Sequence, residues 1–122
     1  MTLRDDCGGM SSGQVHVYLN HGDGSFRFSG AYVVNGEPRD IAAGDLDGDE
    51  RQDLVTANDD GRDIAVLIAT GEGRFAPPHR VSVGPYSLPH EVGIGDFNRD
   101  GVPDVVTVNA NTHDVSVLLG VR

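Results

Sequence analysis

The stretch of sequence that decides the fold is an acidic segment that occurs twice. Its two copies read Asp45-Leu46-Asp47-Gly48-Asp49-Glu50-Arg51-Gln52-Asp53 and Asp96-Phe97-Asn98-Arg99-Asp100-Gly101-Val102-Pro103-Asp104. We name these segments acidic loop 1 and acidic loop 2. Both loops carry oxygen-bearing side chains at positions 1, 3, 5 and 9, so each occupies the same place in a repeated unit.

The similarity extends well beyond the two loops. Residues 41–71 align without a gap to residues 92–122, with 10 identities over 31 positions where chance gives about two. Residues 15–26 align in the same way to residues 64–75. The chain therefore holds the end of one repeat, one complete repeat of about 50 residues and most of another.

Each repeat is built from short apolar runs separated by clusters of Gly, Asp, Asn and Pro. Runs of this length bounded by such breakers are typical of strands, not helices. Four strands in a repeat of about 50 residues match the blade of a β-propeller. The predicted strands cover 15–19 and 26–34 in the first repeat, 41–44, 53–57, 63–69 and 79–83 in the second, and 91–95, 105–109 and 114–119 in the third.

We therefore predict an all-β chain of antiparallel propeller blades, about 2.4 blades per chain. Residues 15–40 form a partial blade, 41–90 a complete blade and 91–122 a second partial blade. Residues 1–14 lack the apolar pattern, so we expect them to be disordered or put to another use. Because a propeller needs at least about four blades to close, uncovered sheet faces and edges predict a homo-oligomer. Phe26, Phe75 and Phe97 are expected to pack between blades.

The acidic loops predict two bound Ca²⁺ ions per chain. Four carboxylates in nine residues repel one another, and Ca²⁺ accepts six to eight oxygen ligands in flexible geometry. No Cys or His stands at zinc-ligand spacing, and the alternative of two acidic turns that cap hairpins is less favoured because the copies are in register. The predicted ligands are the side chains of Asp45, Asp47, Asp49, Asp53, Asp96, Asn98, Asp100 and Asp104, with the backbone carbonyls of Arg51 and Val102 at position 7.

The two loops differ in their turn residues. Loop 2 has Gly101 at position 6, whereas loop 1 has Glu50 there and its glycine, Gly48, at position 4. Glycine is the residue that most easily adopts a positive φ. The backbone path of loop 1 is therefore less well defined by the sequence than that of loop 2.

Composition excludes several classes of function. The 122 residues include 9 basic and 19 acidic ones, and a formal charge of −10 argues against binding nucleic acid or an anionic membrane. A single cysteine allows no disulfide within the chain, and we find no signal peptide or membrane-spanning segment. None of the five histidines pairs with Ser or Cys in a nucleophile pattern, so we expect no enzymatic activity.

Residues 44–49 and 95–101, each followed by Asp-Leu-Val or Asp-Val-Val, resemble FG-GAP repeats, also called VCBS repeats. Residues 22–26 and 117–120 are similar to the third strand and the following hairpin of that family. The family forms the blades of integrin α-subunit propellers and of many bacterial secreted proteins. The resemblance implies a seven-bladed propeller with Ca²⁺ in the acidic loops, held by the ligands named above, although this chain has fewer than three blades.

The resemblance also implies a role and a location. It suggests an extracellular or secreted, non-enzymatic module for binding or adhesion, with a glycan or a protein as ligand and Ca²⁺ as a structural ion. Two alternatives remain open at this point. The chain could be a fragment of a propeller enzyme that acts on polysaccharides, or a purely structural array of blades.

Overall fold

The computed structural model describes residues 2–5, 12–34, 36–59, 61–84 and 87–120, and in these residues it contains strands and turns. Within these ranges it has no helix that is long and apolar enough to cross a membrane. The strands are β1 (Thr2–Asp5), β2 (Ser12–Asn20), β3 (Phe26–Val33), β4 (Pro38–Gly44), β5 (Asp53–Asn58), β6 (Asp63–Leu67), β7 (Ala69–Gly71), β8 (Arg74–Phe75), β9 (His79–Ser82), β10 (Pro89–Gly95), β11 (Asp104–Asn109) and β12 (Asp114–Leu118).

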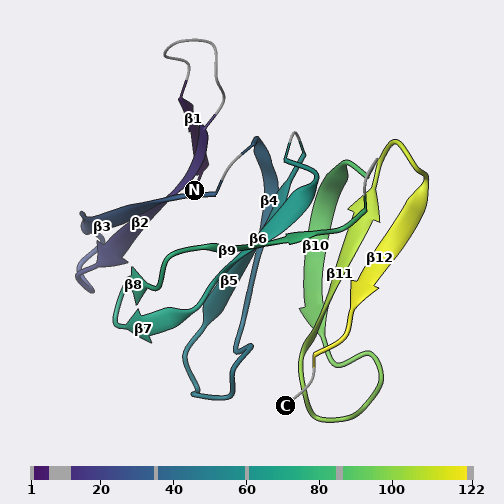
Figure 1. Cartoon of the computed structure of the whole chain (residues 1–122). Helices are drawn as coiled ribbons and strands as arrows, with labels where there is room; N and C mark the ends of the chain where they lie inside the picture. The colour runs from purple at the N-terminus through teal and green to yellow at the C-terminus, as the bar shows by residue number, and fades with distance from the viewer. Residues whose placement is uncertain (1, 6–11, 35, 60, 85–86, 121–122) are drawn as a thin grey trace.

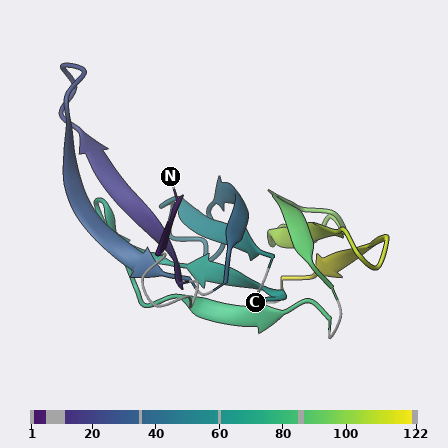
Figure 2. The same ribbon diagram turned by 90° about the horizontal axis from the view of Figure 1, so that it is seen from above.

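Three antiparallel sheets follow one another in chain order (Figures 1 and 2). The first sheet has the order β1-β2-β3, the middle sheet β4-β5-β6-β9 and the third sheet β10-β11-β12, and β7 and β8 form a separate hairpin. The all-β, antiparallel prediction is confirmed. The middle sheet has the four strands, in sequence order, that were predicted for the complete repeat.

Two apolar cores hold the three sheets together. Val15 and Val34 of the first sheet region pack with Leu67 of the middle sheet, and Ile64 of the middle sheet packs with Val105 of the third. Successive residues of a strand point to opposite faces, so Ile64 and Leu67, three residues apart in β6, face different neighbours. The middle sheet is therefore buried on both faces, which is why its apolar runs are nearly continuous.

A buried polar network joins the first two sheets. Thr56 Oγ1 donates to Asn58 Oδ1 at 2.9 Å, and Asn58 Nδ2 donates to Asp63 Oδ1 at 3.0 Å. The same amide donates to the backbone oxygen of Val34 at 3.1 Å. Because buried polar groups are costly unless they are hydrogen-bonded, this saturated network favours one arrangement of the turn between β5 and β6.

The third sheet contains the same network at the equivalent repeat positions. Thr107 Oγ1 donates to Asn109 Oδ1, and Asn109 Nδ2 donates to Asp114 Oδ1, each at 3.0 Å. Ser116 Oγ extends this network by donating to the backbone oxygen of Val83 at 3.1 Å. Several of the identities that reveal the repeat therefore belong to a structural polar cluster at the end of the sheet opposite the acidic loops.

The strand predicted at 63–69 is wrong in one respect, because it ends at Leu67 and a separate hairpin follows. The backbone N–H of Ala69 donates to Asp53 Oδ1 at 2.8 Å instead of continuing the ladder with the neighbouring strand. The other predicted boundaries agree with the observed strands or differ from them by at most three residues. The prediction rested on the run of apolar residues, which does not show that the Asp53 side chain accepts the hydrogen bond from Ala69.

Within residues 1–14 the structure describes 2–5 and 12–14, and both stretches are strand. Thr2–Asp5 form β1, which pairs with β2 in the register Thr2↔Val15 to Asp5↔Ser12. Backbone ladder bonds do not require an apolar pattern, which explains why a strand forms here without one. Residue 1 and residues 6–11 lie outside the described part of the chain.

The expectation for the phenylalanines is correct for one residue of the three. Phe75 packs in the core between the first and middle sheets, with its ring 5.6 Å from that of Tyr32. Phe26 and Phe97 are exposed. Phe26 starts β3 at the tip of a hairpin, and Phe97 lies in acidic loop 2 with its ring over Gly95, where an added Cβ would come within 3.1 Å of it.

Candidate metal sites

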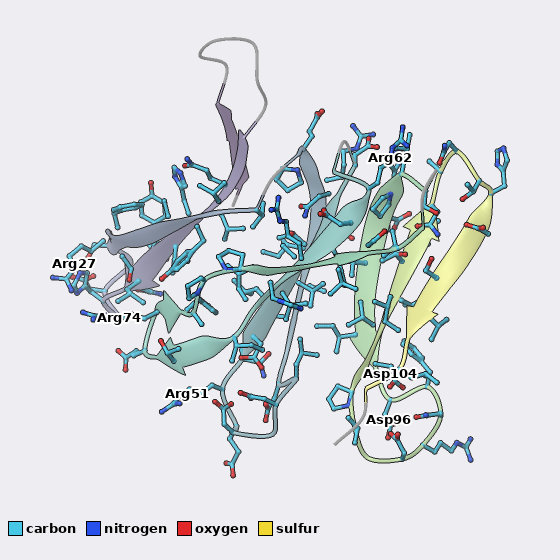
Figure 3. All side chains as sticks on the ribbon, viewed as in Figure 1. Arg27, Arg51, Arg62, Arg74, Asp96 and Asp104 are labelled. Carbon is cyan, nitrogen blue, oxygen red and sulfur yellow. The ribbon has the colours of Figure 1, made fainter. Side chains whose placement is uncertain are left out.

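Acidic loop 1 connects β4 to β5, and acidic loop 2 connects β10 to β11 at the same end of the sheets (Figures 1 and 3). Position 9 of each loop is the first residue of the following strand, and its carboxylate is fully buried. Asp53 Oδ2 accepts a hydrogen bond from the backbone N–H of Leu46, and Oδ1 accepts one from Ala69, both at 2.8 Å. This one side chain ties the start of the loop to the end of β6.

Asp104 does the same in loop 2. Its Oδ2 accepts from the backbone N–H of Phe97 at 2.9 Å, and its Oδ1 accepts from Gly120 at 2.7 Å. Ala69 and Gly120 were not identified as site residues from the sequence, because they act through their backbone. The available signal was their equivalent place in the 51-residue repeat, 16 residues after the position-9 aspartate.

The position-1 carboxylates organise the inside of the loops. Asp45 Oδ1 accepts from the backbone N–H of Gly48 at 2.8 Å, and its Oδ2 accepts from Glu50 at 2.7 Å. Partial desolvation works to raise the pKa of Asp45, but the N–H groups of Glu50 and Gly48 outweigh it and the pKa is lowered. Asp96 is held in the same way by the backbone N–H groups of Asp100 and Gly101.

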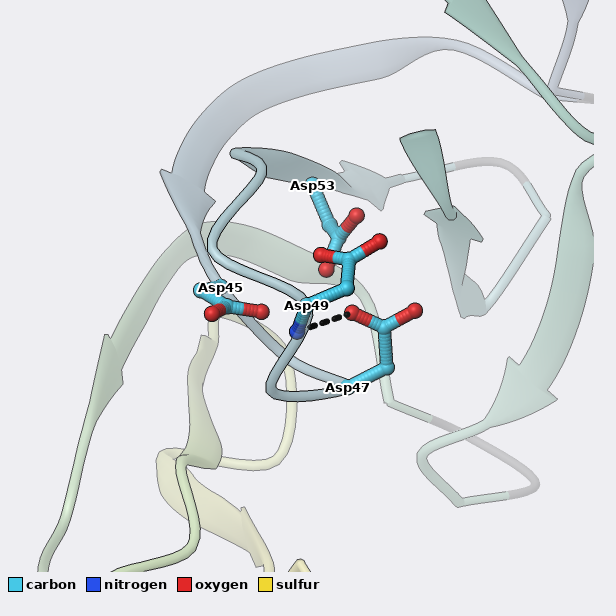
Figure 4. A group of neighbouring side chains, drawn as sticks. All are labelled: Asp45, Asp47, Asp49 and Asp53. Atoms are coloured by element: carbon cyan, nitrogen blue, oxygen red, sulfur yellow. Dashed lines mark hydrogen bonds between the residues drawn. The ribbon is translucent and has the colours of Figure 1, made fainter. Parts of the chain in front are cut away.

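The side chains of acidic loop 1 converge inside the turn, as Figure 4 shows. One oxygen from each of Asp45, Asp47, Asp49 and Asp53 lies within 4.8 Å of the others. Desolvation, the neighbouring Asp49 carboxylate and the charge of Asp53 together raise the pKa of Asp47. Such crowding of like charges disfavours the fully ionised cluster unless a cation joins it.

Acidic loop 2 forms a matching cluster. One oxygen each of Asp96, Asp100 and Asp104 lies within 4.8 Å of the others. The amide of Asn98 points at the same three carboxylates: with its nitrogen turned inward, it donates to Asp100 Oδ1 at 3.0 Å, Asp96 Oδ1 at 3.2 Å and Asp104 Oδ2 at 3.3 Å. With its oxygen turned inward, four oxygens face one another, an arrangement that a cation at its centre would stabilise.

The donor set and its dimensions fit Ca²⁺. Oxygens on opposite sides of a Ca²⁺ ion bound at 2.3–2.6 Å are about 4.6–5.2 Å apart. Each carboxylate oxygen has two lone pairs, so one backbone hydrogen bond leaves capacity for a metal ion. The side chains that the structure brings together are those predicted at positions 1, 3, 5 and 9 of both loops.

The two predicted position-7 ligands lie beside these clusters. The backbone N–H groups of Arg51 and Val102 donate to Asp49 Oδ1 and Asp100 Oδ1, each at 2.9 Å. Their carbonyls as metal ligands stay a prediction. The Arg51 guanidinium is 3.4 Å from Asp49 Oδ2, so this side chain offsets part of the negative charge of loop 1.

The backbone follows one path in both loops, although their glycines are at different positions. Positive φ occurs at positions 4 and 6 in each: Gly48 (80°) and Glu50 (69°) in loop 1, Arg99 (60°) and Gly101 (82°) in loop 2. Each loop therefore places one glycine and one strained residue at the two left-handed positions. The uncertainty about loop 1 that followed from Glu50 at position 6 is thereby resolved.

Comparison with known protein families matches residues 4–56 and residues 45–107 to the FG-GAP-like repeat. The two matches span most of the chain, and the chain belongs to the FG-GAP-like repeat family. The resemblance inferred from the acidic loops is thereby confirmed. A search of curated proteins gave no match.

The shared backbone path predicts that substitutions at the two left-handed positions of loop 2 change the stability of the fold in different ways. We expect Gly101→Ala to lower the free energy of unfolding by about 1 kcal/mol, because alanine is strained at a positive φ. A Cβ at Gly101 meets no atom within 4 Å, so the cost is purely conformational. Urea denaturation in calcium-free buffer measures it.

The matched control is Arg99→Gly, at the other left-handed position of the same loop. We expect this variant to be as stable as the parent or more stable, because glycine removes the left-handed strain. An equal loss of stability in both variants would show that the loop does not follow this backbone path.

Proposed function

We propose that the chain is a calcium-binding module of propeller-type blades. The observation that carries the proposal is the convergence of oxygen ligands in two loops at equivalent repeat positions. A single acidic turn is common without a metal ion. Two turns with the same ligand spacing, the same backbone path and the same buried position-9 aspartate support a common ligand-dependent role.

Calcium is favoured over other ions by ligand type. Both clusters consist of carboxylate and amide oxygens, which hard cations prefer, whereas zinc prefers sulfur and nitrogen ligands. Magnesium demands near-ideal octahedral geometry, while Ca²⁺ tolerates the flexible arrangement that a nine-residue turn provides. Calcium when bound supplies positive charge at the centre of each cluster, and its affinity is expected in the extracellular range, about 10⁻⁴ to 10⁻³ M.

The role of the ion is structural. Asp53 and Asp104 already connect the start of each loop to the end of the third strand of its repeat through backbone N–H groups. The side chains at positions 1, 3 and 5 lie close to these carboxylates, so the four positions together would hold the ion, and its charge would stabilise the loop and with it the register of the adjoining strands. Both oxygens of each position-9 carboxylate accept backbone bonds, which supports a structural rather than a catalytic use.

The proposal has a thermal test. In excess calcium we expect the melting temperature to rise by about 5–10 °C over the value in chelator, since binding to the native state stabilises it by mass action. In the double variant Asp49→Asn, Asp100→Asn, this calcium-dependent rise should be lost, while the melt in chelator is unchanged or higher because carboxylate repulsion is relieved.

The control for this test is Asp23→Asn, an aspartate in the exposed turn between β2 and β3 that caps Ser25. It removes one negative charge away from both clusters and should keep the full calcium-dependent rise. If the parent protein melts at the same temperature in calcium and in chelator, the proposed structural role of calcium is wrong.

We further propose that the module is extracellular and non-enzymatic, and that it binds a glycan. FG-GAP repeats are typically extracellular, which agrees with an expected calcium affinity suited to that environment. A groove of about 580 Å³ lies between the β2–β3 and β7–β8 hairpins. Apolar side chains line part of it, and its polar and charged side chains are Arg27, Ser29, Tyr32, Thr70, Glu72 and Arg74, so two cations stand against one carboxylate. Figure 3 shows Arg27 and Arg74 on these neighbouring hairpins.

The two arginines favour a saccharide that carries carboxylate or sulfate groups, because guanidinium groups bind such anions in bidentate geometry. On an array of neutral and acidic glycans, we expect binding to acidic glycans and its loss in the variant Arg27→Ala, Arg74→Ala. Arg62→Ala, which lies far from the groove in Figure 3, is the control and should bind like the parent. Binding that is unaffected by the double substitution would place the ligand elsewhere.

A further inference from the structure

The middle sheet shows which residues one sheet uses to cover its neighbours. Val55 and Ile64 pack toward the third sheet, while Ala65 and Leu67 pack toward the first. All four side chains are at most 1% exposed. The middle sheet therefore packs against the sheet before it in the chain through one face, which we name the preceding-sheet face. It packs against the sheet after it through the other, which we name the following-sheet face.

The third sheet exposes its following-sheet face. By the 51-residue register of the repeat, Val115 corresponds to Ile64 and Val108 to Ala57, both of which are buried in the middle sheet. Opposite residues in β11 and β12 align these side chains on one face, as in the pair Val108↔Val115. We name this surface the aliphatic face; its members and their exposed fractions are Val108 46%, Val115 57%, Val117 53% and Leu119 56%.

The first sheet exposes the opposite kind of face. By the 49-residue register, His16 and Tyr18 correspond to Ala65 and Leu67 of the middle sheet. Ala65 and Leu67 are the residues through which the middle sheet packs against the first sheet. Tyr18 is 47% exposed and Phe28 is 52% exposed. Their rings meet edge to face at 5.5 Å, and His16 lies against Phe28 at 5.8 Å. We name this surface, formed by His16, Tyr18 and Phe28, the aromatic face.

These two faces cannot meet within one chain. Figures 1 and 2 show the β2–β3 and β10–β12 strands on opposite sides of the middle sheet. The aliphatic face is a following-sheet face and the aromatic face is a preceding-sheet face, so a second copy presents the complementary surface to each. We propose that chains associate head to tail, with the aliphatic face of one copy packed on the aromatic face of the next.

A second copy fits better than an unrelated partner because the contact continues a series that the chain already contains. The first-to-middle and middle-to-third interfaces both pair a following-sheet face with a preceding-sheet face. Sheets with the same twist stack at a similar angle, so a further copy extends this packing. An interface of this head-to-tail kind joins different surfaces of the two subunits and closes into a ring or continues as an open chain.

The test uses the full chain in calcium buffer, with sedimentation velocity between about 1 and 100 µM, where mass action reveals weak association. The parent should self-associate as its concentration rises. Val115→Glu, Val117→Glu removes the aliphatic face, and Tyr18→Glu, Phe28→Glu removes the aromatic face. Each double variant alone should remain monomeric, and an equimolar mixture of the two should form a 1:1 dimer, because each retains the face that the other lacks.

The mixture also shows that both variants are folded, because unfolded chains cannot restore the dimer. The control His79→Glu adds a negative charge at an exposed position of β9, outside both faces, and should associate like the parent. A monomeric parent at the highest concentration overturns the inference, and so does a mixture without a dimer. The variants should keep the calcium-dependent rise in melting temperature, so a failure of assembly is distinguishable from a failure of the calcium proposal.

Discussion

The structure depends on one buried carboxylate in each of two repeats. Asp53 and Asp104 have no exposed surface, and each binds two backbone N–H groups that are far apart along the chain. A buried anion is costly unless its oxygens are hydrogen-bonded. These bonds therefore fix two segments: the loop before the strand that each aspartate begins, and the residues just after the next strand. The acidic loop, the ladder of three strands and the start of the following segment are thereby coupled.

The middle and third sheets each have a polar cluster at both ends. The carboxylate clusters lie at one end, and the networks around Asn58 and Asn109 lie at the other. Between them, the apolar residues have only to cover the neighbouring sheets. A metal ion in each loop would strengthen the first end, while the amide networks keep the second end ordered by hydrogen bonds alone.

Much of this organisation could be predicted because the sequence repeats it. The acidic spacing, the four-strand order of the middle sheet and the eight side chains that converge in the two loops followed from aligned residues. Features that act through the backbone could not be predicted: Ala69 N–H bonding to Asp53, the strand at Thr2–Asp5, and positive φ at Glu50 and Arg99. The exposure of Phe26 and Phe97 also escaped prediction, because residue type does not show which positions have a neighbouring sheet to pack against.

The central claim is that each acidic loop holds one calcium ion. Native mass spectrometry of the full chain, sprayed from calcium-containing volatile buffer, counts bound ions per chain whatever the assembly size. The account predicts a plateau at two calcium ions per chain as the calcium concentration rises. A chain that carries no calcium, or that gains ions without a plateau as a nonspecific acidic surface would, contradicts it.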